Sequence, residues 1–124
     1  MSHPTRVMIV ANHPIMSDGL RLVLQREPDM EVVCAACDLE QGLRDFESSY
    51  PDLVVVDLQL PQGEGLRAVR ALRNLSPSLP MVVLTMYPGQ AVVIESEGVY
   101  EVSGTLSSPA IVAMVRAAAL ANEA

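Results

Sequence analysis

Short apolar runs alternate with segments of helical periodicity along the whole chain. The runs are rich in Val, Ile, Leu and Met and have the length of buried strands. We expect five strands, at residues 6–11, 30–36, 52–57, 80–85 and 99–103. We expect helices at residues 14–27, from Asp38 onward, and at residues 66–75, 90–97 and 108–121. This alternation is typical of parallel β/α packing.

Local signals mark the starts of two helices. Pro14 suits the first turn of a helix, and Asp38 with Gln41 three residues later forms a capping box. The apolar positions of each helix are expected to be buried. They are Ile15, Leu20, Leu22, Val23 and Leu24 in the first helix, and Leu39, Leu43 and Phe46 in the second.

Five β/α units with right-handed crossovers form an open, doubly wound sheet, which we expect to be one domain over residues 1–124. In such sheets, binding sites form beyond the carboxyl ends of the strands. Asn12 and His13 follow the first strand, Asp57 ends the third and Thr85 ends the fourth. Asp57 follows four apolar residues of the third predicted strand and so stands at its carboxyl end. We therefore expect Asp57 at the mouth of the site.

Composition and charge narrow the classes of function. No apolar stretch approaches the ~20 residues that span a bilayer, and the N-terminus lacks a signal-peptide pattern, so we expect a cytoplasmic protein without membrane contact. The formal net charge is −7, and all eight basic residues are arginine. The charge argues against nucleic-acid binding by this domain. The absence of lysine excludes a Schiff base and a P-loop.

Two cysteines, Cys34 and Cys37, form a CxxC pair. A redox pair usually begins a helix, whereas Cys34 falls within a predicted strand. We therefore expect two small buried cysteines in a reducing compartment.

Ordered motifs across all five units resemble the receiver domains of two-component response regulators. They are the His13-Pro14 pair, the run from Asp57 through Pro61, Gly63 and Gly65, the strand that ends in Thr85, and the helix start at Ser108-Pro109. The resemblance covers nearly the whole chain and is closest to regulators with a C-terminal helix-turn-helix, so the domain is expected to control an output module that regulates transcription. It implies a flavodoxin-like (βα)5 fold with strand order 2-1-3-4-5 and a signalling role without enzymatic activity.

The resemblance also implies roles for individual residues. Asp57 matches the aspartate that accepts a phosphoryl group from a histidine kinase, with Mg²⁺ bound beside it. Thr85 matches the hydroxyl that turns toward that group, and the carbonyl of Gln59 matches a metal ligand.

Four residues at three sites depart from the family pattern. Ala11 and Asn12 replace an acidic pair, Thr105 stands at the place of the lysine, and Val102 replaces an aromatic switch residue, although Tyr100 lies nearby on the same strand. Because Mg²⁺ and the lysine both neutralise phosphoryl charge, we expect weak Mg²⁺ binding by Asp57, Asn12 and Gln59 and weak phosphorylation.

Other interpretations of these residues stay open. The first is a fully phosphorylatable receiver that uses Asp57, and the second is a receiver-like domain that senses a small molecule. Asp57 could also simply cap the following loop, and Asn12 and Thr85 could be ordinary hydrogen-bonding residues. A flavodoxin-like electron carrier is disfavoured, because the loop at residues 11–14 lacks the Gly, Ser and Thr that cradle a flavin phosphate.

Two helices carry surface patterns that bear on partners. The last helix pairs a core face with an apolar outer face of Ala113, Ala117, Leu120 and Ala124, which Arg116 interrupts. We expect a homodimer or partner contact there, with alanine-rich composition as the alternative. The arginines Arg67, Arg70 and Arg73 of the third helix are expected to form a solvated face paired with Glu64, rather than an anion-binding stripe.

Overall fold

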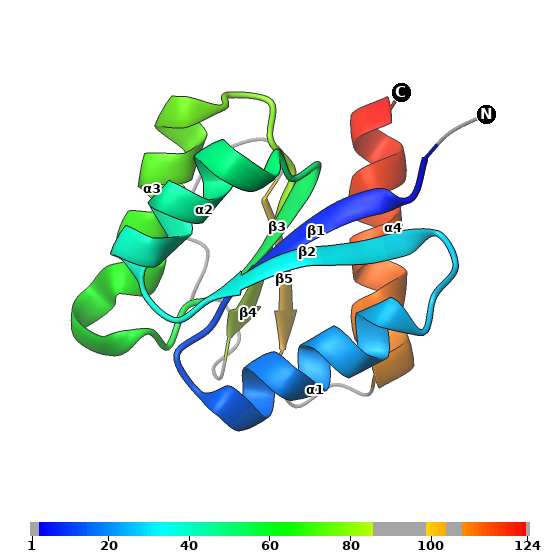
Figure 1. Cartoon of the computed structure of the whole chain (residues 1–124), viewed down its shortest axis with the longest axis horizontal. Helices are drawn as coiled ribbons and strands as arrows, with labels where there is room; N and C mark the ends of the chain where they lie inside the picture. Colours follow the sequence, from blue (N-terminus) through cyan, green and yellow to red (C-terminus); the bar gives the residue numbers. More distant parts are fainter. Residues whose placement is uncertain (1–2, 86–98, 104–107, 124) are drawn as a thin grey trace.

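A computed structural model of the chain describes residues 3–85, 99–103 and 108–123 (Figure 1). Its centre is a five-stranded parallel sheet with strand order β2-β1-β3-β4-β5, which confirms the predicted fold class and order. The strands are β1 (Thr5–Val10), β2 (Met30–Ala36), β3 (Leu53–Asp57), β4 (Met81–Thr85) and β5 (Val99–Ser103). The helices are α1 (Pro14–Gln25), α2 (Leu39–Ser49), η1 (Pro61–Gly63), α3 (Glu64–Leu75) and α4 (Ser108–Glu123). The helix expected at 90–97 lies outside the described residues.

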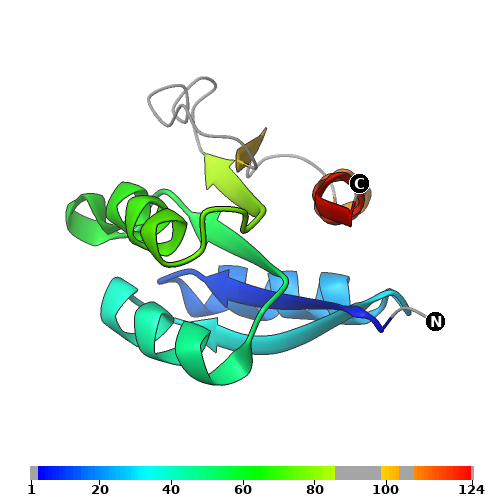
Figure 2. The ribbon, with the colours of Figure 1, turned by 90° about the horizontal axis from the view of Figure 1, so that it is seen from above.

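The sheet separates two apolar cores. Alternate residues of β1 and β3 point to opposite faces: Val7 and Val55 pack with α1 and α4, whereas Met8 and Val54 pack with α2 and α3. Figure 2 shows α2 and α3 side by side and α4 apart from them. Because both faces are covered, the central strands read as continuous apolar runs, as parallel sheets require. None of the described helices is long and apolar enough to cross a bilayer.

The predicted capping box of α2 is present. Asp38 Oδ1 accepts a hydrogen bond from the backbone N–H of Gln41 at 2.8 Å, and Gln41 Oε1 accepts one from the N–H of Cys37 at 3.1 Å. The first bond satisfies one of the otherwise unpaired donors at the start of the helix, and the second pairs the N–H of the residue just before the N-cap Asp38. The predicted ends of the strands and helices lie within about two residues of the observed ones, with α3 beginning at Glu64 rather than residue 66.

The prediction that Ile15 and Leu22 are buried is wrong. Their exposed fractions are 89 % and 59 %, while Leu20 and Leu24 of the same helix are buried. Residues four apart share a helix face, so Leu20 and Leu24 point at the sheet together. Ile15 and Leu22 are seven apart and share the opposite side of α1.

The prediction of two buried cysteines is also wrong for one of them. Cys34 is half-buried and its Sγ lies 3.4 Å from Ser49 Oγ, whereas Cys37 is exposed just before α2. Burial raises the pKa of the Cys34 thiol. Both thiols are free, so the CxxC pair is not a disulfide.

The arginines of α3 do not act alike. Arg67 and Arg70 are exposed, as a solvated face requires, but Arg73 Nη1 donates to the carbonyls of Pro77 and Leu79 at 2.8 and 2.7 Å and closes the turn before β4. The carboxylate of Glu64 is directed to α2, where its Oε1 accepts from the N–H of Leu39 at 3.3 Å. The expected pairing of Glu64 within its own helix is therefore replaced by a link between two helix starts.

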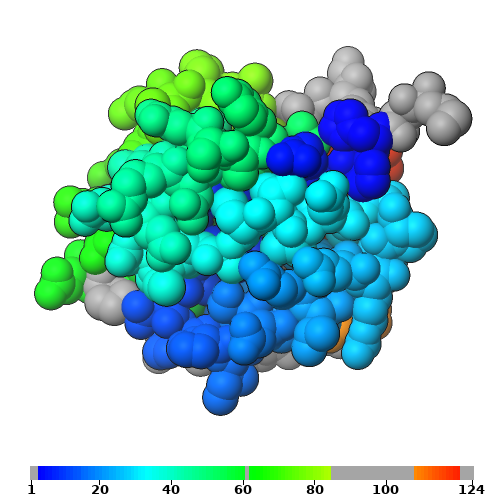
Figure 3. Space-filling model, viewed as in Figure 1, coloured from blue at the N-terminus to red at the C-terminus, as the bar shows by residue number. Residues whose placement is uncertain are grey.

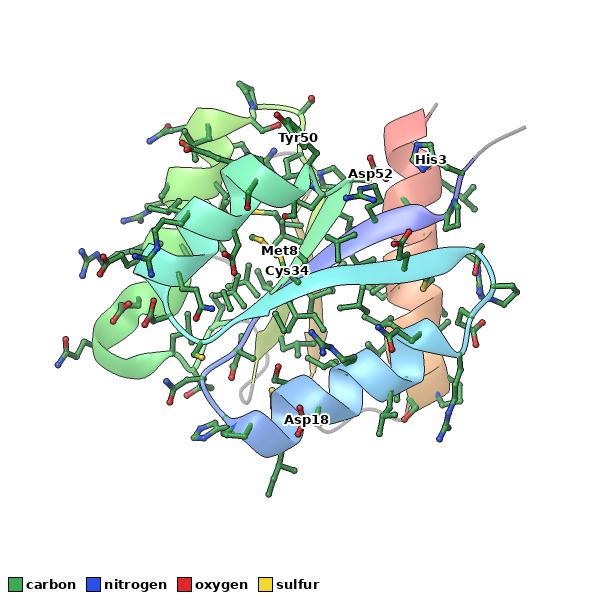
Figure 4. The ribbon with its side chains drawn as sticks, viewed as in Figure 1. His3, Met8, Asp18, Cys34, Tyr50 and Asp52 are labelled. Atoms are coloured by element: carbon green, nitrogen blue, oxygen red, sulfur yellow. The ribbon has the colours of Figure 1, made fainter. Side chains whose placement is uncertain are left out.

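The amino edge of the sheet is held by a separate group of contacts. The Oδ2 atom of Asp52 accepts a hydrogen bond from the N–H of Arg6 at 2.9 Å and lies 3.7 Å from Nδ1 of His3. Arg6 Nη2 also donates to the carbonyl of Ser49 at 2.6 Å. Figure 4 shows His3, Tyr50 and Asp52 at this end of the molecule.

Arg116 ties α4 to the turn between α1 and β2. Its Nε and Nη2 donate to the two carboxylate oxygens of Asp29 at 2.8 and 3.0 Å, and Nη2 also donates to Glu27 Oε1 at 2.7 Å. Bidentate guanidinium–carboxylate pairs of this kind combine charge with fixed geometry. The guanidinium holds the pKa of the Asp29 carboxyl below its usual value.

We expect Arg116→Gln to lower the melting temperature near neutral pH but not in acid. A carboxyl whose pKa is depressed in the folded state stabilises the fold above its unfolded pKa of about 3.9. That contribution is lost as the pH falls through the folded pKa. The difference in melting temperature between wild type and variant should therefore be full at pH 6 and shrink steadily as the pH falls below about 3.9. Arg26→Gln, on an exposed side chain, is the control; a difference that persisted in acid would assign the role of Arg116 to packing.

Candidate functional site

The topology brings three strand ends to one edge of the sheet. Val10 of β1 pairs with Val56 of β3, and Asp57 pairs with Leu84 of β4. The residues after Val10, the carboxylate of Asp57 and the end of β4 at Thr85 therefore meet at the carboxyl edge. Doubly wound sheets bind ligands at this edge. The structure confirms the prediction that Asp57 and Thr85 lie at the carboxyl ends of their strands.

Asp57 is the buried carboxylate of this edge. Its exposed fraction is 2 %, and among the described residues no other charged or polar side chain belongs to the core. Oδ1 accepts a hydrogen bond from the backbone N–H of Gln59 at 2.8 Å. Oδ2 is buried and has no hydrogen-bond partner among the residues that the structure describes. An unpaired buried carboxylate oxygen is costly, so this atom marks a place where a cation or a reacting group would be accommodated.

The loop after Asp57 is fitted closely to the start of α3. The carbonyl of Asp57 accepts from the N–H of Leu60 at 3.3 Å, and Leu58 N–H donates to the carbonyl of Leu84 at 3.1 Å. A Cβ on Gly65 would lie 2.6 Å from Leu58 Cα and 2.8 Å from the Asp57 carbonyl, so only glycine allows this approach. Gly63 has φ of +73°, which also favours glycine. The Gly-rich loop of the sequence thus holds Asp57 in place.

The residues after β1 contribute little charge. Ala11 is buried with an exposed fraction of 3 % and has an apolar side chain. Asn12 is exposed, and its Nδ2 donates to the carbonyl of Cys37 at 3.3 Å, which is the loop hydrogen bond that the sequence left open as an alternative. His13 is exposed at the N-cap of α1 without a side-chain capping bond.

Several candidate residues lie beyond what the structure describes. Thr85 ends β4, and its backbone pairs with Ser103 of β5, but its side chain is outside the described part. The same holds for the side chains of Tyr100 and Val102, and Thr105 lies outside the described residues altogether. Their roles stay predictions.

The donors that could hold Mg²⁺ are the Asp57 carboxylate, the Gln59 carbonyl and the Asn12 amide oxygen. Within the described ranges, no cluster of three or more His, Cys, Asp or Glu side chains could hold a metal ion. Mg²⁺ is usually bound through one or two carboxylates and hard oxygen ligands. One carboxylate with a neutral amide is a weaker donor set for Mg²⁺ than two carboxylates would be.

Sequence reasoning missed two supporting contacts at this edge. Glu64 bonds the first residue of α2, and the Cys37 carbonyl orients Asn12. Both contacts join residues that are 25 positions apart in the chain, and no local sequence motif indicates such contacts. The sequence shows Gly63 and Gly65 in this loop, but it does not show that Gly65 abuts the backbone of Leu58.

Comparison with known proteins decides the family. The model of the response regulator receiver domain matches residues 7–117. The chain belongs to the response regulator receiver domain family.

The relatives of this receiver domain include transcriptional regulatory proteins. It is 34 % identical over 89 residues to the uncharacterized transcriptional regulatory protein YhcZ of Bacillus subtilis, covering 72 % of this chain and 42 % of YhcZ. It is also 34 % identical over 83 residues to the nitrate/nitrite response regulator protein NarL of Escherichia coli, covering 67 % of this chain and 38 % of NarL. The chain thus spans about two fifths of the length of these curated relatives.

Solved structures agree with the fold. A LuxR-family two-component response regulator from Aurantimonas superposes with a TM-score of 0.86 at 29 % identity, covering 95 % of this chain and 86 % of that one. A CheY-like receiver domain protein from Methanospirillum hungatei superposes with a TM-score of 0.83 at 19 % identity, covering 98 % of both chains. The second likeness shows the fold alone.

We expect Asp57→Asn to raise the free energy of unfolding by about 1 kcal/mol in metal-free buffer. The amide keeps an oxygen for the Gln59 N–H and removes a buried charge. Denaturant unfolding measures the change. Asp52→Asn, on a carboxylate that already has partners, should give no gain. A loss of stability in Asp57→Asn would mean that Oδ2 has a favourable partner in solution.

Proposed function

We propose that this receiver domain relays signals through protein–protein contacts, and that phosphorylation of Asp57 is weak or absent. The observation that carries the proposal is the isolation of Asp57. Its Oδ2 is buried without a described partner, and Ala11 and Asn12 supply no second carboxylate.

The charge balance at the site supports this proposal. Phosphoryl transfer depends on positioning and on cations that neutralise the charge that develops. The chain has no lysine, and four of its arginines contact groups elsewhere: Arg6 at the amino edge, Arg44 on α2, Arg73 at the end of α3 and Arg116 at the α1–β2 turn. A phosphoryl group on Asp57 would therefore meet little positive charge.

The partners follow from the family and from the relatives. A histidine kinase or another signalling protein acts on the receiver, and a transcription-controlling module is its output. The domain itself catalyses no reaction. It binds no nucleic acid directly, because its net charge of −7 repels phosphates. It works in the cytoplasm, as its relatives' role in transcription implies.

One observation favours a different function. The unpaired Oδ2 of Asp57 leaves an oxygen open to attack a phosphoryl donor, as full phosphorylation would require. The two proposals differ in how much positive charge binds beside Asp57. The amount of phosphoryl group incorporated by the protein measures this difference.

We expect the double variant Ala11→Asp/Asn12→Asp to incorporate at least about tenfold more phosphoryl group from acetyl phosphate than wild type in the presence of Mg²⁺. Restoring two carboxylates strengthens the cation site beside Asp57. Intact-protein mass spectrometry measures incorporation, and binding of beryllofluoride gives a second readout.

The control is Asp57→Ala in the double-variant background, which should abolish the mass gain. Circular dichroism checks that the new carboxylate at buried position 11 leaves the fold intact. If wild type already gains as much mass as the double variant, the fully phosphorylatable receiver is the correct interpretation.

The outer face of α4 is the contact surface that we propose for a second copy or an output module. Ala113 and Ala117 are exposed, and Leu120 has an exposed fraction of 60 %. Small side chains allow another helix to approach closely, and exposed apolar area favours its burial. Arg116 does not interrupt this surface as a free charge, because it is paired with Glu27 and Asp29.

We expect Leu120→Glu to lower the mass that sedimentation velocity reports for concentrated protein. A buried carboxylate in an apolar contact is costly, so the dimer would dissociate. Leu75→Glu, on the exposed surface of α3, is the matched control. An unchanged mass in Leu120→Glu would discard the homodimer contact through α4.

A further inference from the structure

A hollow lies between α1 and the first turns of α4. The two helices meet where α1 ends and α4 begins (Figure 1). In the space-filling view, α1 forms the lower rim of the molecule, and the start of α4 lies behind its end (Figure 3). The hollow has an inner part of about 190 Å³ and an outer part of about 350 Å³, and because Val23 and Ser108 line both, the two parts adjoin. The outer part alone has the size of a small-molecule site, ~300 Å³ or more.

The inner part of the hollow is apolar. Apart from Ser108, its lining consists of Met16, Gly19, Leu20, Val23, Leu84 and Ile111. Gly19 keeps this part open, since a Cβ built on it would meet no atom within 4 Å. Glycine inside a helix costs about 1 kcal/mol relative to alanine, and the φ of Gly19 is not in the left-handed region that would require it. The space beside Gly19 therefore suits an apolar group of a ligand.

The outer part of the hollow carries its charge. Arg26, Glu27 and Arg116 belong to its lining. Arg116 is already paired with the carboxylates of Glu27 and Asp29, at 2.7 to 3.0 Å. Arg26 is exposed, and its guanidinium has no ion pair or hydrogen bond among the described residues. The charge that lacks a partner is therefore positive, and charge complementarity favours an anionic ligand over a cationic one.

The spacing of these features defines the shape of the ligand. Gly19 and Arg26 are seven residues apart on α1, which corresponds to about 10 Å along the helix. A molecule that reaches from one to the other must be apolar over most of its length and carry an anion at one end. A carboxylate matches the guanidinium, because the two groups form a pair of parallel hydrogen bonds.

We propose that the hollow between α1 and α4 binds a medium-chain carboxylic acid of the length of octanoate. The alkyl chain fills the inner part beside Gly19, and the carboxylate contacts the guanidinium of Arg26. Ser108, which lines both parts, contributes a hydroxyl group between them.

This inference goes beyond the proposed signalling role and does not depend on phosphorylation of Asp57. A ligand held between α1 and α4 gives the receiver an input that needs no phosphoryl group. Failure of the acetyl phosphate experiment leaves the inference intact, and its own failure leaves the assignment of Asp57 intact.

The test is isothermal titration calorimetry with sodium octanoate below its micelle-forming concentration, and with 1-octanol as the uncharged probe. Wild type should bind one octanoate per chain, and its melting temperature should rise with octanoate concentration. Arg26→Gln should weaken octanoate binding about fivefold, as expected for a partly exposed ion pair, and leave octanol binding unchanged. Gly19→Leu should weaken the binding of both probes at least about tenfold, because its side chain occupies the apolar space that both need.

Two further variants keep the test independent of folding defects. Gly19→Ala should weaken binding in the same direction while raising the melting temperature of the free protein, because alanine favours the helix and its methyl group meets no atom. Arg21→Gln removes an exposed arginine of α1 that lines neither part, and it should bind octanoate as wild type does.

Three results would overturn the proposal. The first is the absence of saturable octanoate binding by wild type. The second is equal octanoate affinity in wild type and Arg26→Gln, because the carboxylate would then not contact Arg26. The third is octanoate binding that a folded Gly19→Leu variant leaves unchanged, because the alkyl chain would then lie outside the hollow.

Discussion

Burial of the sheet on both faces is the constraint from which the rest of the structure follows. Leu53, Val54, Val55 and Val56 are fully buried, so β3 has no solvent face on which a polar side chain could lie. Charge can enter such a strand only where it ends, and parallel strands all end at the same edge. The position of Asp57 is therefore a consequence of the architecture. The architecture does not fix which polar groups surround that carboxylate, and in this chain they are few.

Three arginines with well-defined contacts serve the architecture rather than the site. Arg6 binds the carbonyls at the end of α2, Arg73 closes the turn before β4, and Arg116 holds α4 to the α1–β2 turn. Each satisfies carbonyl or carboxylate groups that the fold would otherwise leave unpaired. Asp57 receives one backbone hydrogen bond instead. A buried anion with so few partners is a source of instability in the resting protein, and stability and phosphoryl chemistry are therefore opposed at this residue.

Features that depend on neighbouring residues in the sequence were predictable. Strand positions followed from apolar runs, and the α2 start followed from Asp38 and Gln41, since both signals act within one turn. The position of Asp57 followed from topology. The exposure of Ile15 and Leu22 was missed, because apolar character was taken for burial without regard to the helix face. The contacts of Glu64 with Leu39 and of Asn12 with Cys37 join distant segments, and only the packed structure specifies them. The unpaired Oδ2 of Asp57 was likewise beyond sequence reasoning, since it depends on every neighbouring atom.

The contact surface that we propose on α4 and the sparse charge at Asp57 are connected through the energetics of signalling. Phosphorylation shifts the equilibrium between two conformations of a receiver's surface. The shift is limited by the difference in free energy with which the phosphate interacts with each conformation. Where Asp57 lacks cations to bind a phosphate, that difference is small, and contacts must be stable without it. The exposed apolar face of α4 that we propose as a contact surface would meet this requirement, because its affinity would come from burying Leu120 rather than from a charge-driven rearrangement. Its occupancy would then be set by protein concentration and by competition between partners, which needs no chemistry at the sheet edge.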